Sequence, residues 1–265
     1  MHRLNTEIDL RRAIANSELH LVYQPIIDLT DNRISGVEAL VRWSHPTRGL
    51  LCPAEFLPIA EDSSLIVPIG TWVLNAACAQ ARRWNGPAAG RPLTMAVNVS
   101  LRQLSSGSFE LALDQALSRS GADPHQIHLE ITETVLMGAT RSMRTQLNSV
   151  SDHGIHVGLD DFGTGHSSLS LIKEFPVKFL KIDRSFISGL GQDRDDTAIT
   201  GAVIELSQTL GMDVVAEGIE TRDQLEILRH LGCRYAQGYY LSRPQSADEL
   251  QDLLDRHPTW HPALR

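Results

Sequence analysis

Short apolar runs and longer segments with helical spacing alternate along the whole chain. The apolar runs predict eight strands, at residues 21–29, 34–40, 94–99, 127–132, 156–160, 179–183, 213–217 and 235–241. Most of them are continuously apolar, as in Met95-Ala96-Val97, which indicates strands that are buried on both faces. The spacing of apolar residues between them predicts helices, among them 68–84, 109–120 and 141–153.

Several of the predicted helices carry recognisable end signals. A helical repeat of apolar residues stops at Gly211, a residue type that commonly terminates helices. Thr221 with Gln224, and Ser246 with Glu249, have the spacing of a capping box, which opens a helix. Repeated strand and helix units of this length imply parallel strands joined by right-handed crossovers.

The number of strands favours a closed barrel. Eight strands in a chain of 265 residues fit an α/β fold of the (βα)8 TIM-like type. Only residues 30–33 separate the first two strands, too few for a parallel crossover, so the first strand should be antiparallel to the rest. A helix at 4–15 should cover the start of the barrel. An open doubly wound sheet is the alternative.

The chain is expected to be a single domain over 1–265, with the barrel at about 4–254 and a short tail at 255–265. Its 24 basic and 32 acidic residues give a net charge of -8, which argues against binding a nucleic acid polymer. The odd number of cysteines indicates reduced thiols and a cytoplasmic location. No segment resembles a signal peptide or a membrane span, so no membrane contact is expected.

Polar side chains gather where the predicted strands end. Barrel active sites lie at the carboxyl ends of the strands, so these side chains are expected to meet at one rim. They are Glu38, Asn98, Glu130, Asp160, Asp161, Lys181, Asp183, Glu217 and Gln237. One such carboxylate is usually a helix cap or half of a salt bridge. A set that comes from several strands instead favours a functional site.

So many carboxylates at one rim would repel each other unless a cation neutralised them. The candidate ligands are all oxygen donors, which favours magnesium or manganese, and their number suits two ions better than one. Two ions about 3.5–4 Å apart can stabilise the attacking and leaving oxygens of a phosphoryl displacement. Calcium is expected to occupy the site and inhibit, because its looser geometry misplaces the attacking water.

Two basic side chains near this rim have alternative interpretations. Lys181 is either a surface lysine paired with an acid or a residue of the site. It is two residues from Asp183 on a buried strand, so both face the same way, and we expect both in the site, with Asp183 contacting the substrate. Arg42 is either a structural ion-pair partner or a clamp for a phosphate. Asp161-Phe162-Gly163 matches a protein kinase triplet, but the chain lacks the other kinase motifs.

Eight blocks of the sequence resemble the EAL domains, bacterial phosphodiesterases that open cyclic di-GMP. The signature block is Glu38-Ala39-Leu40-Val41-Arg42-Trp43. The others, in the family's order, are Tyr23-Gln24-Pro25-Ile26, Asn98-Val99-Ser100, Glu130-Ile131-Thr132-Glu133, Asp160-Asp161-Phe162-Gly163-Thr164-Gly165, Lys181-Ile182-Asp183, Glu217-Gly218-Ile219-Glu220 and Gln237-Gly238-Tyr239. A tripeptide alone would be weak evidence, but ordered blocks along most of the chain are strong.

The resemblance implies a barrel with its first strand antiparallel, and hydrolysis of cyclic di-GMP to linear pGpG with magnesium or manganese. The matching metal ligands are Glu38, Asn98, Glu130, Asp160 and Asp161. The matching residues that position or activate the attacking water are Lys181 and Glu217, and loss of Glu38 should also abolish turnover. The matching substrate contacts are Gln24, Arg42 and Gln237. Glu133 matches the acid that holds the 160–165 loop beside the family's dimer interface.

The partners implied are cyclic di-GMP, a second copy in a homodimer, and an upstream sensory or GGDEF domain. The chain would then be the cytoplasmic output part of a larger protein, membrane-anchored or not. Rival hypotheses are a non-catalytic cyclic di-GMP receptor or docking module, and a barrel phosphodiesterase for a lipid or glycerol ester. His166 and Ser64 depart from the family pattern, which commonly has an aromatic residue and a glycine there.

Overall fold

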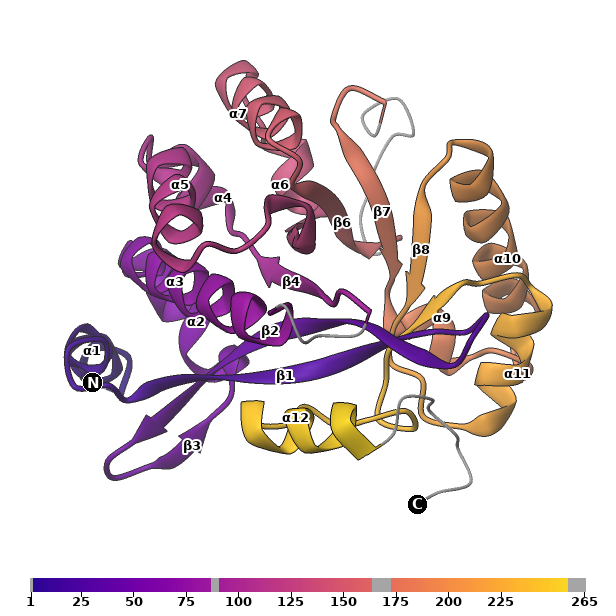
Figure 1. The fold of residues 1–265 in the computed structure, drawn as a ribbon, viewed down its shortest axis with the longest axis horizontal. Helices are drawn as coiled ribbons and strands as arrows, with labels where there is room; N and C mark the ends of the chain where they lie inside the picture. Colours follow the sequence, from indigo (N-terminus) through magenta and orange to yellow (C-terminus); the bar gives the residue numbers. More distant parts are fainter. Residues whose placement is uncertain (1, 87–90, 164–172, 257–265) are drawn as a thin grey trace.

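The computed structural model describes residues 2–86, 91–163 and 173–256, and within them the predicted barrel is confirmed (Figure 1). Its strands are β1 (Leu19–Asp28), β2 (Arg33–His45), β4 (Thr94–Asn98), β5 (Ile127–Thr132), β6 (His156–Phe162), β7 (Val177–Ile182), β8 (Asp213–Ala216) and β9 (Tyr235–Ala236). They follow the order β1-β9-β8-β7-β6-β5-β4-β2, and β1 pairs back with β2. This pairing closes the ring, so the open sheet is excluded.

The first strand is antiparallel to both of its neighbours, β2 and β9, as predicted. The reason is a tight turn, since only residues 29–32 lie between β1 and β2. In that turn the Asp28 carboxylate accepts hydrogen bonds from the backbone and hydroxyl of Thr30, at 3.0 and 2.6 Å. Asn32 adopts a φ of 57°, a left-handed conformation that asparagine tolerates. The other adjacent strands of the ring are parallel.

The hairpin of β1 and β2 is longer than predicted. β2 continues to His45, and the short strand β3 (Gly49–Leu51) pairs with this extension. The next element is α2 (Pro53–Asp62), and neither it nor β3 was predicted. The fully buried ring of Trp43 packs edge-on against Phe56 of α2, with 5.7 Å between the ring centroids. The apolar side chains of the extension, Trp43, Leu51 and Phe56, therefore join the large core under the helices.

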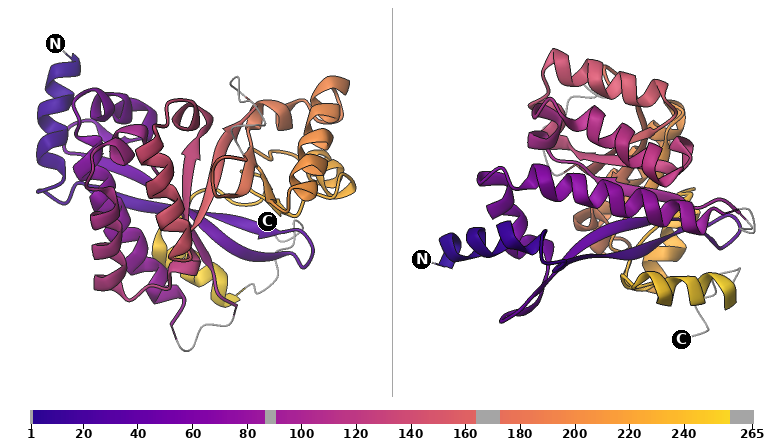
Figure 2. Two further views of the ribbon diagram at one scale, coloured as in Figure 1. Left: turned by 90° about the horizontal axis from the view of Figure 1, so that it is seen from above. Right: turned by 60° about the vertical axis from the view of Figure 1, so that its left-hand side comes forward.

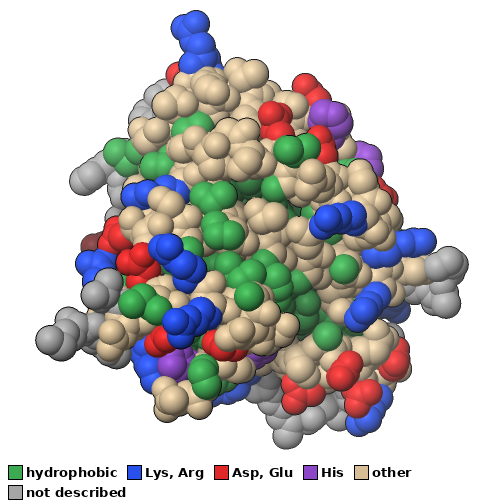
Figure 3. Space-filling model, turned by 90° about the vertical axis from the view of Figure 1, so that its left-hand side faces the viewer, with side chains coloured by type: hydrophobic (Ala, Val, Ile, Leu, Met, Phe, Trp, Pro, Cys, Tyr) green, Lys and Arg blue, Asp and Glu red, His purple; other side chains and the backbone are tan. Residues whose placement is uncertain are grey.

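The N-terminal helix α1 (His2–Ala13) forms close to its predicted position but covers a different part of the molecule. It packs against α2 at the outer end of the hairpin, not over the start of the barrel (Figure 1). Arg48 from the turn between β2 and β3 donates a hydrogen bond to Thr6 at 3.2 Å. On this face, hydrophobic side chains lie among charged ones (Figure 3), and Ile8 and Leu50 are exposed.

Helices pack around the barrel (Figure 2), and most of them lie between its strands in the sequence. The longer ones are α3 (Ile66–Trp84), α5 (Phe109–Ser120), α7 (Arg141–Asp152), α10 (Arg194–Thr209), α11 (Arg222–His230) and α12 (Ala247–Arg256). The short ones are α4 (Leu101–Ser105), α6 (Glu133–Met137) and α9 (Arg184–Ser188). The predicted capping boxes at Thr221 and Ser246 both form. None of the described helices has the length and apolar content needed to cross a membrane.

The inside of the barrel holds a small apolar cluster separate from the large core under the helices. It consists of Ile26, Phe179 and Val215, with Tyr235 packed against them. Gly158 leaves room for the Phe179 ring, because a Cβ at this position would lie 2.0 Å from the nearest ring carbon. This cluster supports the polar side chains that occupy the next layer, toward the carboxyl ends of the parallel strands.

Five strands end earlier than predicted: β1, β4, β7 and β8 by one residue each, and β9 by five residues. The early ends of β9 and β7 affect Gln237 and Asp183 at the polar rim. β9 ends at Ala236 because the chain turns at Gly238, whose carbonyl accepts a hydrogen bond from the Leu241 amide at 3.0 Å. Asp183 lies after β7 and caps α9, accepting a hydrogen bond from the Ser185 amide at 2.9 Å. Gln237 and Asp183 are therefore loop residues at the rim.

Candidate functional site

Lys181 lies in the middle of the polar rim and is surrounded by four carboxylates. Its Nζ is 2.7 Å from Glu217 Oε1, 2.9 Å from Glu130 Oε2, 3.3 Å from Glu38 Oε2 and 3.4 Å from Asp160 Oδ2. Lys181 is only 1% exposed. The structure therefore brings together five side chains that the sequence distributes over five strands or their ends.

Amide side chains fix the orientation of Glu38. Asn98 Nδ2 donates to Glu38 Oε1 at 2.7 Å, and Gln237 Nε2 donates to Glu38 Oε2 at 2.8 Å. Gln237 Nε2 also lies 3.1 Å from Gln24 Oε1, and Gln24 in turn donates to the Ser242 carbonyl at 3.0 Å. This chain of hydrogen bonds connects β1, β2, β4 and the segment after β9 across the mouth of the barrel.

Burial has the largest influence on the ionisation of this cluster. It raises the pKa of Glu217 to about 8 and the pKa of Glu130 well above its ordinary value, although Lys181 opposes both shifts. Burial also favours a high pKa for Glu38, but Lys181 and two amide donors outweigh it and lower that pKa. Burial opposes the charge of Lys181, yet the carboxylates raise its pKa well above the ordinary value. The carboxylates around Lys181 would therefore carry more negative charge, if all were ionised, than its one ammonium group can neutralise.

Asp160 and Asp161 bring adjacent carboxylates to the same rim. Asp161 has a φ of 55°, an uncommon conformation for a residue with a side chain, and its amide donates to Asp160 Oδ1 at 2.9 Å. Burial, followed by the nearby charges of Asp160 and Asp183, raises the pKa of Asp161. Strained backbone of this kind tends to persist at functional sites.

The donor atoms fit divalent cations. Two sets of three carboxylates have oxygen atoms within 4.8 Å of one another, and they share Asp160. One set adds Glu38 and Glu130, and the other adds Asp161 and Glu217. Glu130 Oε1 is buried without a hydrogen-bond partner among the described residues, which leaves an oxygen directed into the cluster and available to a cation. Such oxygen donors suit magnesium or manganese.

A pocket opens directly above this cluster. Its lining includes the predicted residues Gln24, Glu38, Asp160, Asp161, Lys181, Asp183, Glu217 and Gln237. It also includes residues for which the sequence suggested no role: Leu40, Arg184, Gly218, Glu220, Gly238 and Tyr239. All of these except Arg184 belong to sequence blocks that resemble the EAL family, whereas Arg184, an exposed residue at the start of α9, belongs to none of the blocks.

Four other predicted site residues do not line the pocket. Asn98 and Glu130 belong to the cluster below it, and Arg42 lies further along β2, where its guanidinium donates to the Val41 carbonyl at 2.9 Å. Glu133 is 3% exposed, and its Oε2 accepts a hydrogen bond from the Gly163 amide at 3.2 Å. Residues 164 and 165 of the predicted loop and His166 lie outside the described residues.

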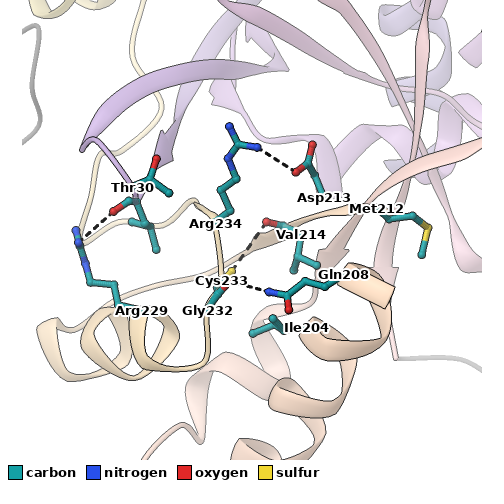
Figure 4. A pocket seen from close by; sticks show the side chains of 11 residues that line it. Thr30, Ile204, Gln208, Met212, Asp213, Val214, Arg229, Gly232, Cys233 and Arg234 are labelled. Carbon is teal, nitrogen blue, oxygen red and sulfur yellow. Dashed lines mark hydrogen bonds and ion pairs between the residues drawn. The ribbon is translucent and has the colours of Figure 1, made fainter. Parts of the chain in front are cut away.

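A second pocket lies near the amino ends of the parallel strands, and its described lining lacks the cluster of unbalanced acidic groups found at the rim (Figure 4). Its charged groups are engaged within the fold. Arg234 lies 3.6 Å from Asp213, and Arg229 donates to the Leu29 carbonyl at 3.2 Å. Cys233 is buried, and burial raises its pKa to about 12, so it is a poor nucleophile. The chemistry of the molecule is therefore expected at the acidic rim.

The fold and the site together define a barrel with an acidic cluster, of a composition suited to cations, at the carboxyl ends of its parallel strands. The chain belongs to the EAL domain family, whose model matches residues 7–244. This match confirms the family suggested by the sequence motifs.

The chain is similar to larger bacterial proteins. It is 43% identical over 243 residues to the bifunctional diguanylate cyclase/cyclic di-GMP phosphodiesterase MucR of Pseudomonas aeruginosa, covering 91% of this chain and 35% of MucR. It is 40% identical over 248 residues to the cyclic di-GMP phosphodiesterase PA2567 of the same species, covering 93% of this chain and 42% of that protein. The chain thus spans between about a third and two fifths of these two relatives.

Solved structures agree with this assignment. The MucR phosphodiesterase in complex with c-di-GMP has a TM-score of 0.87 and 42% identity, with 93% of this chain and 99% of that chain covered. The EAL enzyme Bd1971 with cAMP and cyclic di-GMP bound has a TM-score of 0.90 and 33% identity, with 96% of this chain and 69% of that chain covered.

Proposed function

We propose that this EAL domain hydrolyses cyclic di-GMP to linear pGpG, and so ends or tunes signalling by this second messenger. The observation that carries the proposal is the carboxylate cluster around Lys181, with two cation-binding sets that share Asp160. The names of MucR and PA2567, and the c-di-GMP complex of MucR, support the choice of substrate.

The cations proposed are two magnesium or two manganese ions. Their ligands would be Glu38, Asn98, Glu130, Asp160 and Asp161. Bound cations of this kind lower the pKa of water and neutralise charge on a phosphoryl group. Their charge would also relieve the excess of acid in the cluster, which the Lys181 ammonium balances only in part.

The side chains around the cluster would orient the reactants. Lys181 and Glu217 would position or activate a water molecule, and Gln24, Arg42, Gln237 and Asp183 would contact the cyclic dinucleotide. The water oxygen attacks phosphorus in line with the 3′ oxygen, the bond from phosphorus to that oxygen breaks, and the 3′ oxygen takes up a proton. The product then carries a 5′ phosphate and a free 3′ hydroxyl, which is linear pGpG.

The proposed role of Glu133 is to hold the segment that follows Asp161, and its hydrogen bond to Gly163 supports this role. We also propose that the domain works as a homodimer and receives signals from a sensory or GGDEF domain. The bifunctional name of MucR, of which this chain covers 35%, supports the second of these proposals.

Incubation of the purified chain with cyclic di-GMP and magnesium, followed by chromatography, tests the function. Wild type should form pGpG, and Asp160→Asn, which weakens both cation-binding sets, should form at least 100-fold less, by analogy with the loss of a metal ligand. If wild type binds cyclic di-GMP but makes no product with magnesium or manganese, the domain is a receptor instead. Calcium should support binding without turnover.

A further inference from the structure

Two basic side chains are among the described residues that line the active-site pocket, and their surroundings differ. Lys181 is 1% exposed and already faces four carboxylates. Arg184 is exposed and is the first residue of α9. Within the described ranges its guanidinium has neither an ion pair nor a hydrogen bond. Arg184 therefore has a charge to offer to a ligand, and Lys181 does not.

The backbone around Arg184 fixes the base of its side chain. A Cβ built on Gly218 would lie 2.3 Å from Arg184 Cβ and 3.2 Å from its Cα, so these two segments are in contact. Gly218 also has a φ of 69°, which favours glycine. Asp183 caps the helix in front of Arg184. Packing thus holds Arg184 at the rim, while its guanidinium lies in an exposed position.

The pocket is lined mostly by acidic side chains, which would repel a ligand with two negative charges. A positive charge near Arg184 is therefore needed if such a ligand is to bind. Apart from the two basic residues, the ionisable carboxyl groups of the lining are Glu38, Asp160, Asp161, Asp183, Glu217 and Glu220. A cyclic dinucleotide has two phosphodiester groups, each with one negative charge. Cations held by the carboxylate cluster would neutralise only the phosphate that is cut, and the other phosphate would meet carboxylates.

We propose that Arg184 binds the phosphodiester of the cyclic dinucleotide that is not cut. A guanidinium can donate two parallel hydrogen bonds to a phosphate, and this geometry gives both charge neutralisation and orientation. The inference rests on the proposed function, because it takes cyclic di-GMP as the ligand of the pocket. Arg184 thereby selects a substrate with two phosphates over a diester with one.

The test compares Arg184→Ala with Arg194→Ala. Arg194 is the exposed first residue of α10 and does not line this pocket, so it is a matched control. For Arg184→Ala, the Kd for cyclic di-GMP in calcium and the KM in magnesium should rise about 10- to 100-fold, the value of a charge-assisted hydrogen bond. The kcat should change less than about 3-fold, and Arg184→Lys should recover part of the loss.

A one-phosphate substrate, bis(p-nitrophenyl) phosphate, separates this role from a general effect on the site. Arg184→Ala should cleave it with the kcat/KM of wild type. Equal losses on both substrates, or a Kd for cyclic di-GMP within twofold of wild type, would overturn the inference while leaving the phosphodiesterase proposal intact. If wild type neither binds nor cleaves cyclic di-GMP, the proposed function itself fails, and the role of Arg184 fails with it.

Discussion

At the scale of single residues, the central feature is one buried ammonium among four buried or partly buried carboxylates. The sequence predicts which residue types reach the rim, because each follows an apolar strand. It does not predict that Lys181 contacts the acids directly, since that depends on the curvature of the barrel. The sequence did not predict a role for Arg184, because an arginine at the start of a helix is usually an ordinary surface residue.

The Lys181→Met variant tests how this ammonium stabilises the metal-free site. Removal of Lys181 leaves buried carboxylates without a counter-charge, so the free energy of unfolding should fall by about 3 kcal/mol in a chelating buffer. Magnesium or manganese should restore more stability to this variant than to wild type. Urea unfolding with and without metal measures both effects. Lys178→Met, an exposed position on the same strand, is the control; equal losses in the two variants would contradict the account.

The Gln237→Leu variant tests the orientation of Glu38. Leucine has a similar volume but cannot donate to Glu38 or to Gln24, so Glu38 loses one of its two amide donors. Loss of such a supporting hydrogen bond typically weakens metal binding 10- to 100-fold. Calorimetric titration with manganese measures the affinity. An affinity within twofold of wild type would show that Glu38 does not depend on Gln237.

At the scale of the elements, buried strands were predictable because continuous apolar runs identify them. The elements that were missed include β3 and α2 on the hairpin extension, where β3 has only three residues and α2 contains Pro58. They also include α4, α6 and α9, which have five residues each. Their length and composition give weak signals. β9 was predicted too long because an apolar run continues past the turn at Gly238, where the Ile219 backbone leaves no space for a side chain.

Gly158→Ala tests the packing inside the barrel. The added methyl group would overlap the Phe179 ring, and overpacking of this kind costs about 1–3 kcal/mol. Chemical denaturation should show this loss, and Phe179→Leu in the same chain should recover part of it. Gly201→Ala, within α10 and with its nearest contact at 3.4 Å, is the control and should leave stability equal or higher. A Gly158→Ala variant as stable as wild type would exclude this packing.

His128 on β5 predicts a pH dependence of stability. Burial and then His156 lower its pKa to about 3 from an ordinary value of 6.5, so the unfolded chain binds a proton that the native chain does not. Stability from this group is therefore present above pH 6.5 and is lost as the pH falls toward 3. Between pH 7 and 5.5 the loss is about 1.2 kcal/mol. In urea unfolding, His128→Leu should lose less stability over this range; an unchanged dependence would contradict the prediction.

At the scale of the whole molecule, the closed ring gives the site its composition. Each parallel strand delivers a side chain to the same end of the barrel, and the antiparallel hairpin adds Gln24 and Glu38, which are paired in register. This architecture was predictable from the count of strands and one short connection. The arrangement of charges in the pocket was not, because it arises only when distant segments meet.

The central proposal is that the acidic cluster is a metal-dependent phosphodiesterase site. The rate of pGpG formation from cyclic di-GMP, measured against magnesium concentration from chelator to saturation, tests it most directly. We expect no product in chelator, a rate that rises to saturation with magnesium, and pGpG as the product. Hydrolysis that persists in chelator, or intact cyclic di-GMP at saturating magnesium and manganese with folded protein, would contradict it.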